Sequence, residues 1–280
     1  MIRPTWRVIA SALAGAWMVL LAGCGASTLP RVEDSSTVEV ARGMIAKHDY
    51  IAASELLKRY VERNAGSGQV DDAIFLLGES HLLAKEYASA ELEYDRLLRD
   101  YPESDSSAAA SFRLGEAYAG QSRMEDFDQE FTVKALEQYQ RYLRDYPGDW
   151  RNAEAQTRIA QLRTRLARKL LNTGTLYVKL NEPAAAGVYF ARVRDEFSDT
   201  ALLGDAILGV AQCDALEGRR DEAIAALKEL EAQFHGTPLG GRAAHERRRI
   251  EHLPATYHPP KKVHTVPLPP PTGQPQQGPQ

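Results

Sequence analysis

One spacing pattern recurs along most of the chain and constrains its fold more than any other feature. In residues 75–102, Gly78 is followed twelve positions later by Ala90. The same interval separates a Gly from an Ala in residues 172–200. Variants of the pattern, with a longer interval or without the Gly, occur in AKHDYIAASELLKRY, in FRLGEAYAG followed by ALEQYQRYLRDYP, and in ILGVAQCDALEGRRDEAIAALKEL. Five copies in phase indicate one structural unit repeated in tandem.

The pattern resembles the tetratricopeptide repeat, a pair of antiparallel helices that cross where both carry a small residue. Small residues let the two backbones approach, and a larger side chain one turn further on fills the groove. One pair cannot bury its apolar face alone, so stacking on the next pair stabilises it. The resemblance implies an all-α fold, a right-handed superhelical solenoid of about five tetratricopeptide-like helix pairs. Core packing is the expected role of the repeat aromatics Tyr94, Tyr139, Tyr142, Tyr177 and Phe190.

Two segments depart from a regular array. The third copy holds about eight extra residues around QSRMEDFDQE, between Gly115 and Ala135. Residues 149–180 contain no Pro and only one Gly, which allows a helix of roughly thirty residues. This segment is strongly basic, and two interpretations stay open: a solvated face that joins two halves of the array, or a surface for an acidic partner. Cys213, at helical spacing in the fifth copy, is expected to be a small buried hydrophobe.

The N-terminus predicts export and lipid attachment. Arg3 and Arg7 precede the apolar run VIASALAGAWMVLLAG, which is typical of a secretory signal. A retained membrane anchor is the alternative, but the run is shorter than the roughly 20 residues that span a bilayer. The run ends in LAGC, which resembles the lipobox of bacterial lipoproteins and implies cleavage before Cys24 and acylation of its thiol. Two or more acyl chains anchor a protein stably, and Gly25, where an Asp favours inner-membrane retention, points to the outer membrane.

These features divide the chain into four parts. We expect a cleaved lipoprotein signal peptide, a lipidated tether, a repeat domain and a Pro-rich tail that favours polyproline II or disorder. The tail is interpreted either as a ligand for a partner or the cell wall, or as dispensable. The expected bounds are 1–23 for the signal peptide, 24–37 for the tether, 38–250 for the repeat domain (38–148 N-terminal half, 149–238 C-terminal half, 239–250 capping helix) and 251–280 for the tail.

The sequence shows no pattern typical of catalysis. It contains no Gly-rich phosphate loop, no H-E-x-x-H, no C-x-x-C and no G-x-S-x-G. Five of the seven His residues follow residue 234 at irregular spacing, so a metal site is not expected. The net charge of -4 does not favour nucleic acid. We therefore expect no enzymatic activity, no cofactor, no metal, no nucleic acid and no small-molecule substrate.

The segment QLRTRLARKLLNTGTLYVKLNEPAAAGVYFARVRDEFSDT carries a more specific resemblance. Together with the lipoprotein signal and the repeats, it resembles the BamD family of outer-membrane assembly lipoproteins. The family elements are an LR-x-RLA stretch (162–167), Y-x-K (177–179), AA with a following aromatic (185–190) and a closing FSDT (197–200). The resemblance covers about residues 38–235. Family members usually carry a Glu shortly after RLA, where this chain has Lys169, Leu170 and Leu171, and YP where it has FS.

The resemblance implies a non-enzymatic role at the periplasmic face of the outer membrane, where the protein is held by its N-terminal lipid. A groove of residues 40–120 would receive the C-terminal signal strand of unfolded outer-membrane proteins. Residues 150–235 would dock on a BamA-like barrel subunit, with Arg163, Arg165 and Arg194 as candidate partner-binding residues. For Arg194 the preferred interpretation is a cation that complements a helix C-terminus. The alternatives are a general repeat lipoprotein that scaffolds another cell-envelope, secretion or peptidoglycan complex, and a regulatory accessory to an envelope enzyme.

Overall fold

The computed structural model describes residues 36–124 and 127–252. Every regular element in these residues is an α-helix, and no strand occurs among them. The all-α prediction is therefore confirmed. The expected signal peptide, Cys24, nearly all of the tether and the Pro-rich tail beyond residue 252 lie outside the described residues.

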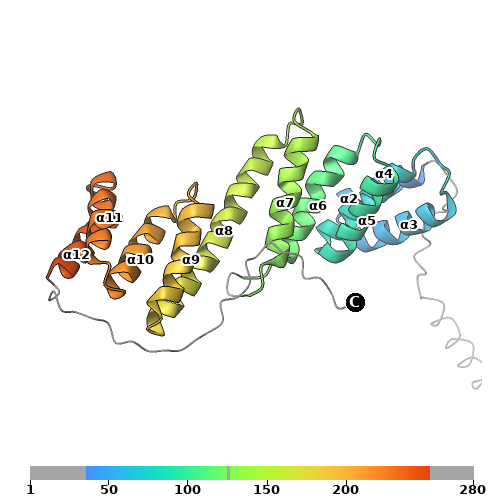
Figure 1. Cartoon of the computed structure of the whole chain (residues 1–280). Helices are drawn as coiled ribbons and strands as arrows, with labels where there is room; N and C mark the ends of the chain where they lie inside the picture. Colours follow the sequence, from blue (N-terminus) through green and yellow to red (C-terminus); the bar gives the residue numbers. More distant parts are fainter. Residues whose placement is uncertain (1–35, 125–126, 253–280) are drawn as a thin grey trace, which may run out of the picture.

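The helices form five antiparallel pairs and one final helix, arranged side by side in an elongated, curved array (Figure 1). The five pairs agree with the number that the repeats predict. The final helix lies where a capping helix is expected. In chain order the pairs are α2 (Thr37–Ala46) with α3 (Tyr50–Arg63), α4 (Val70–Leu83) with α5 (Tyr87–Asp100), α6 (Ser107–Gln121) with α7 (Glu130–Asp145), α8 (Asn152–Lys179) with α9 (Pro183–Glu196), and α10 (Leu203–Leu216) with α11 (Arg220–Gln233), followed by α12 (Pro238–Glu251).

Four of the five pairs turn through a short connection with the same backbone conformation. The middle residue of each turn has positive φ: His48 at 63°, Lys85 at 63°, Asn181 at 60° and Gly218 at 88°. This left-handed residue ends the first helix and lets the chain reverse within three residues. In the third pair the turn is replaced by residues 122–129. The extra residues expected in this copy therefore lie in the loop between α6 and α7.

The recurring spacing of Gly and aromatic residues produces close helix crossings. A Cβ added to Gly78 would lie 2.6 Å from Cε1 of Tyr94, and one added to Gly174 would lie 2.8 Å from Cε1 of Phe190. Both rings are buried against the glycine backbone. In the fifth pair, Gly209 instead contacts Phe190 of the preceding pair, where a Cβ would lie 2.6 Å from Cγ. The fifth copy has a leucine, Leu227, at the repeat position that carries the aromatic residue in other copies, and the ring nearest to Gly209 comes from the fourth pair.

The core prediction for the other aromatic residues holds, although one of them is only partly buried. Tyr94, Tyr139 and Tyr142 are fully buried. Tyr177 is half-buried, and its ring stacks on that of Tyr189 with centroids 5.3 Å apart and an interplanar angle of 12°. Tyr177 therefore packs against the buried cluster of Ala186, Phe190 and Cys213 but remains partly exposed at the end of α8.

Two further expectations concern the C-terminal half. α8 is one continuous helix of 28 residues, close to the length expected. Cys213 is buried and free, as expected. Burial is the main cause that raises the pKa of the Cys213 thiol to about 12, and the nearby Glu217 carboxylate adds to it. The thiol therefore stays neutral and packs as a small hydrophobic group. Within residues 36–124 and 127–252, no helix has the length and apolarity needed to cross a membrane.

The first helices of the pairs lie closer together than the second helices. The backbones of α2 and α4 approach each other, as do those of α4 and α6, of α8 and α10, and of α10 and α12. The backbones of α6 and α8 stay further apart, and α8 packs instead against α7. The array is therefore least closely joined between its third and fourth pairs, which is where the expected N-terminal and C-terminal halves meet.

Candidate protein-binding surfaces

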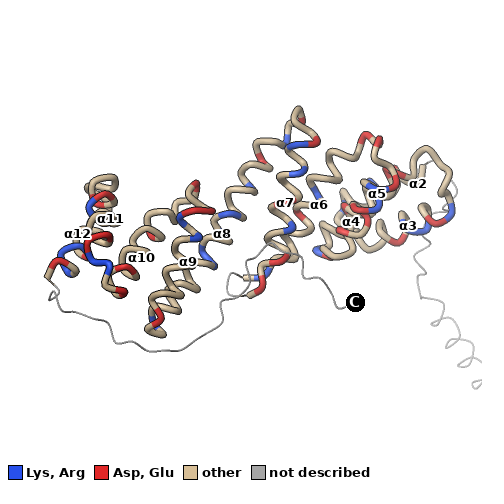
Figure 2. The backbone as a smooth tube through the Cα atoms, viewed as in Figure 1, with Lys and Arg blue, Asp and Glu red and all other residues tan. Residues whose placement is uncertain are grey.

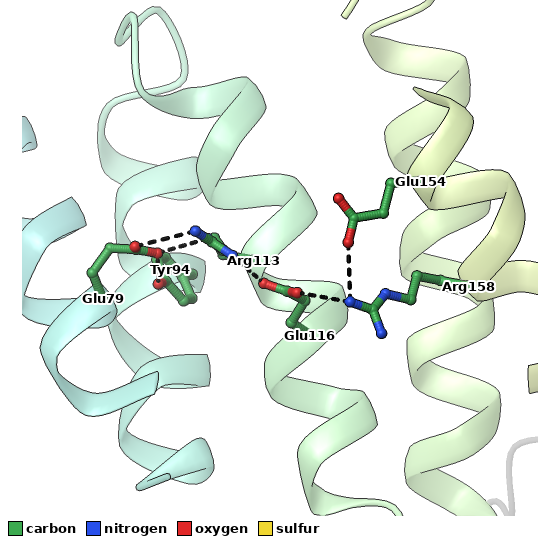
Figure 3. Close-up of polar contacts among 6 residues, drawn as sticks. All are labelled: Glu79, Tyr94, Arg113, Glu116, Glu154 and Arg158. Carbon is green, nitrogen blue, oxygen red and sulfur yellow. Dashed lines mark hydrogen bonds and ion pairs between the residues drawn. The ribbon is translucent and has the colours of Figure 1, made fainter. Parts of the chain in front are cut away.

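A row of charged side chains crosses this junction along the first helices α4, α6 and α8 (Figure 3). We call it the charged ladder. Arg113 of α6 binds Glu79 of α4 through Nε at 2.8 Å and Glu116 of its own helix through Nη1 at 2.5 Å. Arg158 of α8 then approaches Glu116 at 3.6 Å and Glu154 at 3.0 Å. The ladder therefore links α4, α6 and α8, including the two first helices whose backbones stand apart.

The ladder is anchored at one end by a buried tyrosine. The Tyr94 hydroxyl donates to Oε1 of Glu79 at 2.8 Å. Burial, reinforced by the Glu79 charge, raises the pKa of Tyr94 well above its usual range, so the hydroxyl remains a donor. Burial lowers the pKa of Arg113, but the charges of Glu79 and Glu116 outweigh this effect and the net shift is upward. Arg113 therefore stays charged between its two carboxylates.

Tyr139, which occupies the corresponding position in the third helix pair, lacks such an acceptor among the described residues. Tyr139 packs on Gly115 as Tyr94 packs on Gly78, yet its buried hydroxyl has no hydrogen-bond partner among the described residues. Glu116 occupies the position of Glu79 but pairs with Arg113 and Arg158 instead. A recess of about 360 Å³ opens here between α4, α6 and α7, the start of α5 and the N-terminal part of α8. It is lined by Leu82, Leu83, Tyr87, Arg113, Glu116, Ala119, Gly120, Tyr139 and Arg158.

A larger cleft lies on the side of the second helices at the same junction. It has a volume of about 690 Å³, with α8 between α7 and α9 and with residues 127–129 at one edge. We call it the junction cleft. Its apolar lining is Phe127, Val133, Leu136, Leu166, Leu170 and Phe197. Acidic and basic residues are interspersed along the whole array (Figure 2), and both kinds surround this cleft.

Arg163 and Arg165 are engaged within the chain. Arg163 donates through Nε to Asp199 at 2.7 Å and through Nη2 to the carbonyl oxygen of Glu196 at 2.6 Å. Its guanidinium also lies 5.1 Å from the ring centroid of Phe197, so it fastens α8 to the end of α9. Hydrogen bonding to Arg163 lowers the pKa of Asp199. Arg165 donates from Nη2 to the carbonyl oxygen of Arg123 at 2.7 Å and so ties the 122–129 loop to α8.

Arg194 is the most exposed of the three candidate arginines. It lies in the last turn of α9 and pairs with the adjacent Asp195 at 2.7 Å. It also lines a recess of about 260 Å³ formed with α10 and α11. The three arginines therefore form no single cluster, because each contacts a different segment.

Sequence reasoning missed the charged ladder and the junction cleft. A signal for the ladder was present, since Gly-Glu recurs at 78–79 and 115–116 and places a carboxylate beside each crossing. The cleft had no comparable signal, because its lining comes from three helices and a loop. Among the described residues, no group of three or more His, Cys, Asp or Glu side chains is arranged to hold a metal ion.

Comparison with protein families gives one match that covers more than half of the chain. The family model described as "YfiO: Outer membrane lipoprotein" matches residues 41–230. The matched range runs from α2 through most of α11 and includes the ladder, the cleft and all three arginines. No curated protein matches the sequence.

Several solved structures are similar at low identity. A thermophilic tetratricopeptide-repeat protein from Thermus thermophilus shares 19% identity, covers 78% of this chain and 98% of its own, and has a TM-score of 0.33. A tetratricopeptide-repeat protein from Parabacteroides merdae shares 16% identity, with 77% and 72% covered and a TM-score of 0.34. YrrB, described as having an unusual peptide-binding site, shares 16% identity, with 78% and 93% covered and a TM-score of 0.34. The repeat architecture of this chain rests on its own helix pairs.

Proposed function

The chain belongs to the YfiO family of outer membrane lipoproteins, and from that membership we propose that it is an assembly factor for outer-membrane barrel proteins. In this proposal it is held at the periplasmic face by acyl chains on Cys24. Its N-terminal half binds unfolded barrel proteins, and its C-terminal half binds a BamA-like barrel subunit. The observation that carries the proposal is the presence of two separate recesses, one beside the charged ladder in the N-terminal half and one beside Arg194 in the C-terminal half.

The recess beside the charged ladder supports a peptide-binding role for the N-terminal half. Leu82, Leu83 and Tyr87 offer apolar surface, and Arg113 and Glu116 place charged donors and acceptors directly beside it. An extended peptide needs both, because its backbone seeks hydrogen bonds while its alternate side chains seek apolar pockets. The first three helix pairs contain most of this recess and overlap the groove of residues 40–120 expected from the sequence.

Arg194 supports a docking role for the C-terminal half. Its side chain is 44% exposed, and it stands beside the recess that Ile207, Val210 and Ala226 line on α10 and α11. An exposed arginine next to apolar side chains is a common anchor at protein interfaces. Arg163 and Arg165 contribute indirectly, because their contacts hold α9 and the 122–129 loop against α8.

Photo-cross-linking tests the client site. A photoreactive residue at Leu83, which is 45% exposed beside the recess, should cross-link to a peptide that carries the C-terminal strand of a barrel protein. The same label at Leu92, which is 65% exposed on α5, is the matched control and should not. Equal labelling at both positions contradicts the proposed groove.

Pull-down from outer-membrane extract tests the partner. The wild-type chain should recover a barrel subunit, and Arg194→Glu should recover less while the client cross-link at Leu83 persists. Recovery of a peptidoglycan enzyme without the barrel subunit would instead favour a general envelope scaffold.

The lipid anchor is tested by incorporation of a radioactive fatty acid. The wild-type chain should take up label and Cys24→Ser should take up none. Equal labelling of both chains would mean that the lipid is attached to another residue, and no labelling of the wild-type chain would mean that the protein is not acylated.

A further inference from the structure

The junction cleft exposes apolar side chains at the least closely joined point of the array, and the Arg123 guanidinium covers one of them, with its carbon 4.5 Å from the ring centroid of Phe127. Phe127, at its edge, is 43% exposed although it is a large aromatic residue. Phe197 contributes a second ring to the lining. A cleft of about 690 Å³, with the exposed ring of Phe127 at its edge and the largely buried ring of Phe197 in its lining, is large enough for several residues of an extended chain. Grooves lined by aromatic side chains are the usual receptors for Pro-rich segments, which pre-order as polyproline II and lose little entropy on binding.

The charges around the cleft add a second constraint on what occupies it. Four acidic residues and three basic residues surround the apolar lining, so the rim carries a net negative charge. An occupant with positive charge beside an apolar Pro-rich stretch would complement it. The rim residues are Asp128, Glu130, Glu137 and Glu196 against Lys134, Lys169 and Arg192.

The chain contains such a segment after α12. Residues 253–280 hold no Asp or Glu and carry Lys261 and Lys262. A few residues further on lies VPLPPP, residues 266–271, in which Val266 and Leu268 are set among four prolines. Positive charge therefore lies close to an apolar Pro-rich stretch, which matches the combination of acidic rim and apolar lining.

The length of the connecting segment also fits. α11, α10 and α9 separate the end of α12 from the cleft (Figure 1). Helices pack about 8–10 Å apart, so the gap to cover is roughly 30–40 Å. At about 3.1 Å per residue in polyproline II, roughly 10–13 residues cover it. If the connecting segment begins at residue 253, it ends at about residues 262–265, directly before VPLPPP begins at residue 266.

We propose that residues 266–271 of this chain occupy its own junction cleft, with Lys261 and Lys262 beside the acidic rim. The packed segment covers Phe127 and braces α7 against α9 across the junction. This binding site is separate from the ladder recess and from Arg194, so it does not depend on the client or barrel-subunit assignments.

The test places a photoreactive residue at Leu268 of the full-length chain and maps the cross-links by mass spectrometry. We expect cross-links within one chain, to residues 127–140 of the loop and α7 or to 166–170 of α8, with a yield that does not change with protein concentration. Phe127→Glu should lower this yield about fivefold, because an added charge at the aromatic wall weakens binding by about 1 kcal/mol. Leu92→Glu is the matched control, an exposed leucine away from the cleft, and should leave the yield unchanged.

Each remaining outcome overturns the proposal. Cross-links to other surfaces, or a yield that Phe127→Glu does not lower, show that the tail does not use the cleft. Cross-links between chains, with a yield that rises with concentration, show that a second copy supplies the occupant. Circular dichroism of both glutamate variants confirms that the helical array is intact, so that a lost cross-link reports the cleft.

Discussion

The second and third helix pairs share the same packing of a tyrosine on a glycine but differ in the hydrogen bonding of the tyrosine hydroxyl. Each has Gly-Glu on its first helix and a tyrosine on its second, and each tyrosine ring packs on the glycine. In the second pair the Tyr94 hydroxyl donates to Glu79. In the third pair the Tyr139 hydroxyl has no partner among the described residues, because Glu116 is drawn to Arg113 and Arg158. The difference arises at the junction, where α8 supplies a positive charge that the second pair does not face.

Two copies with the same local sequence pattern can therefore differ in the hydrogen bonds and ion pairs that stabilise them. Ring packing on glycine depends on spacing within one copy, so both pairs achieve it. The hydrogen bond depends on which charges neighbouring copies bring to the same carboxylate. The third pair gives up a buried hydrogen bond and gains an ion pair that reaches across to the C-terminal half.

The largest effect should come from filling the space beside the two rings. Gly78→Val and Gly115→Val should each lower the free energy of unfolding by about 3 kcal/mol, because the added side chain overlaps a buried ring. Urea denaturation followed by circular dichroism measures the change. Gly43→Ala is the control, since a Cβ there meets nothing within 4 Å, and it should raise stability slightly. A small loss at one glycine alone would mean that its ring can move aside and that the two crossings are not equivalent.

Removal of the two hydroxyl groups should separate the pairs most clearly. Tyr94→Phe should lower the free energy of unfolding by about 1 kcal/mol, because Glu79 loses one of its donors and keeps only Arg113. Tyr139→Phe should cause no loss and a gain of up to about 1 kcal/mol, because an unpartnered buried hydroxyl disappears. The same urea titration compares both variants with wild type. Equal losses would indicate that Tyr139 has an acceptor in solution.

A double-mutant cycle tests why Tyr139 lacks an acceptor. In the Arg158→Met background, Oε1 of Glu116 is released to accept from Tyr139. Adding Tyr139→Phe to that background should then lower the free energy of unfolding by about 0.5–1 kcal/mol, whereas the same change in the wild-type background should lower it by nothing. The difference is the coupling energy between positions 139 and 158. The matched cycle of Arg158→Met with Tyr94→Phe should be additive, because Tyr94 bonds Glu79 rather than Glu116. Additivity in both cycles would contradict competition for Glu116.

The smallest effect concerns the residue before each tyrosine. In the third pair Gln138 donates to the carbonyl oxygen and Oγ of Ser111 at 3.0 and 2.9 Å, whereas the second pair has Glu93 with one buried carboxylate oxygen lacking a hydrogen-bond partner. Burial raises the pKa of Glu93 against the opposing charges of Arg96, His81 and Lys58. Since the folded-state pKa lies above the unfolded one, stability falls as pH rises from the usual Glu range through the raised pKa.

Glu93→Gln should therefore raise stability at pH 7 by less than about 1 kcal/mol, and the gain should fade as pH falls below the raised pKa. Urea midpoints measured from pH 4 to pH 7 follow this dependence. Gln138→Glu is the reciprocal variant and should show the opposite pH trend. If Glu93→Gln raised the free energy of unfolding equally at every pH, the cause would be packing rather than the ionisation of Glu93.

Spacing along the chain was enough to predict the all-helical fold, the five pairs and the loop insertion in the third pair, and the lack of Pro in residues 149–180 predicted the long α8. All of these depend on residues within one copy, where neighbours along the chain are also neighbours in space. The family resemblance was readable for the same reason, since its motif lies in the continuous stretch 154–200. The buried Cys213 was predictable from helical spacing alone.

Contacts between copies, in contrast, became visible only in three dimensions. The stacking places Phe190 on Gly209 of the next pair, binds Arg163 to the end of α9 and Arg165 to the carbonyl oxygen of Arg123, and leaves Tyr177 half-exposed. It also builds the charged ladder and the junction cleft from elements of different copies. The physical reason is that these contacts depend on the offset between stacked pairs. That offset follows from how all the interhelical side chains pack together, and no single repeat encodes it.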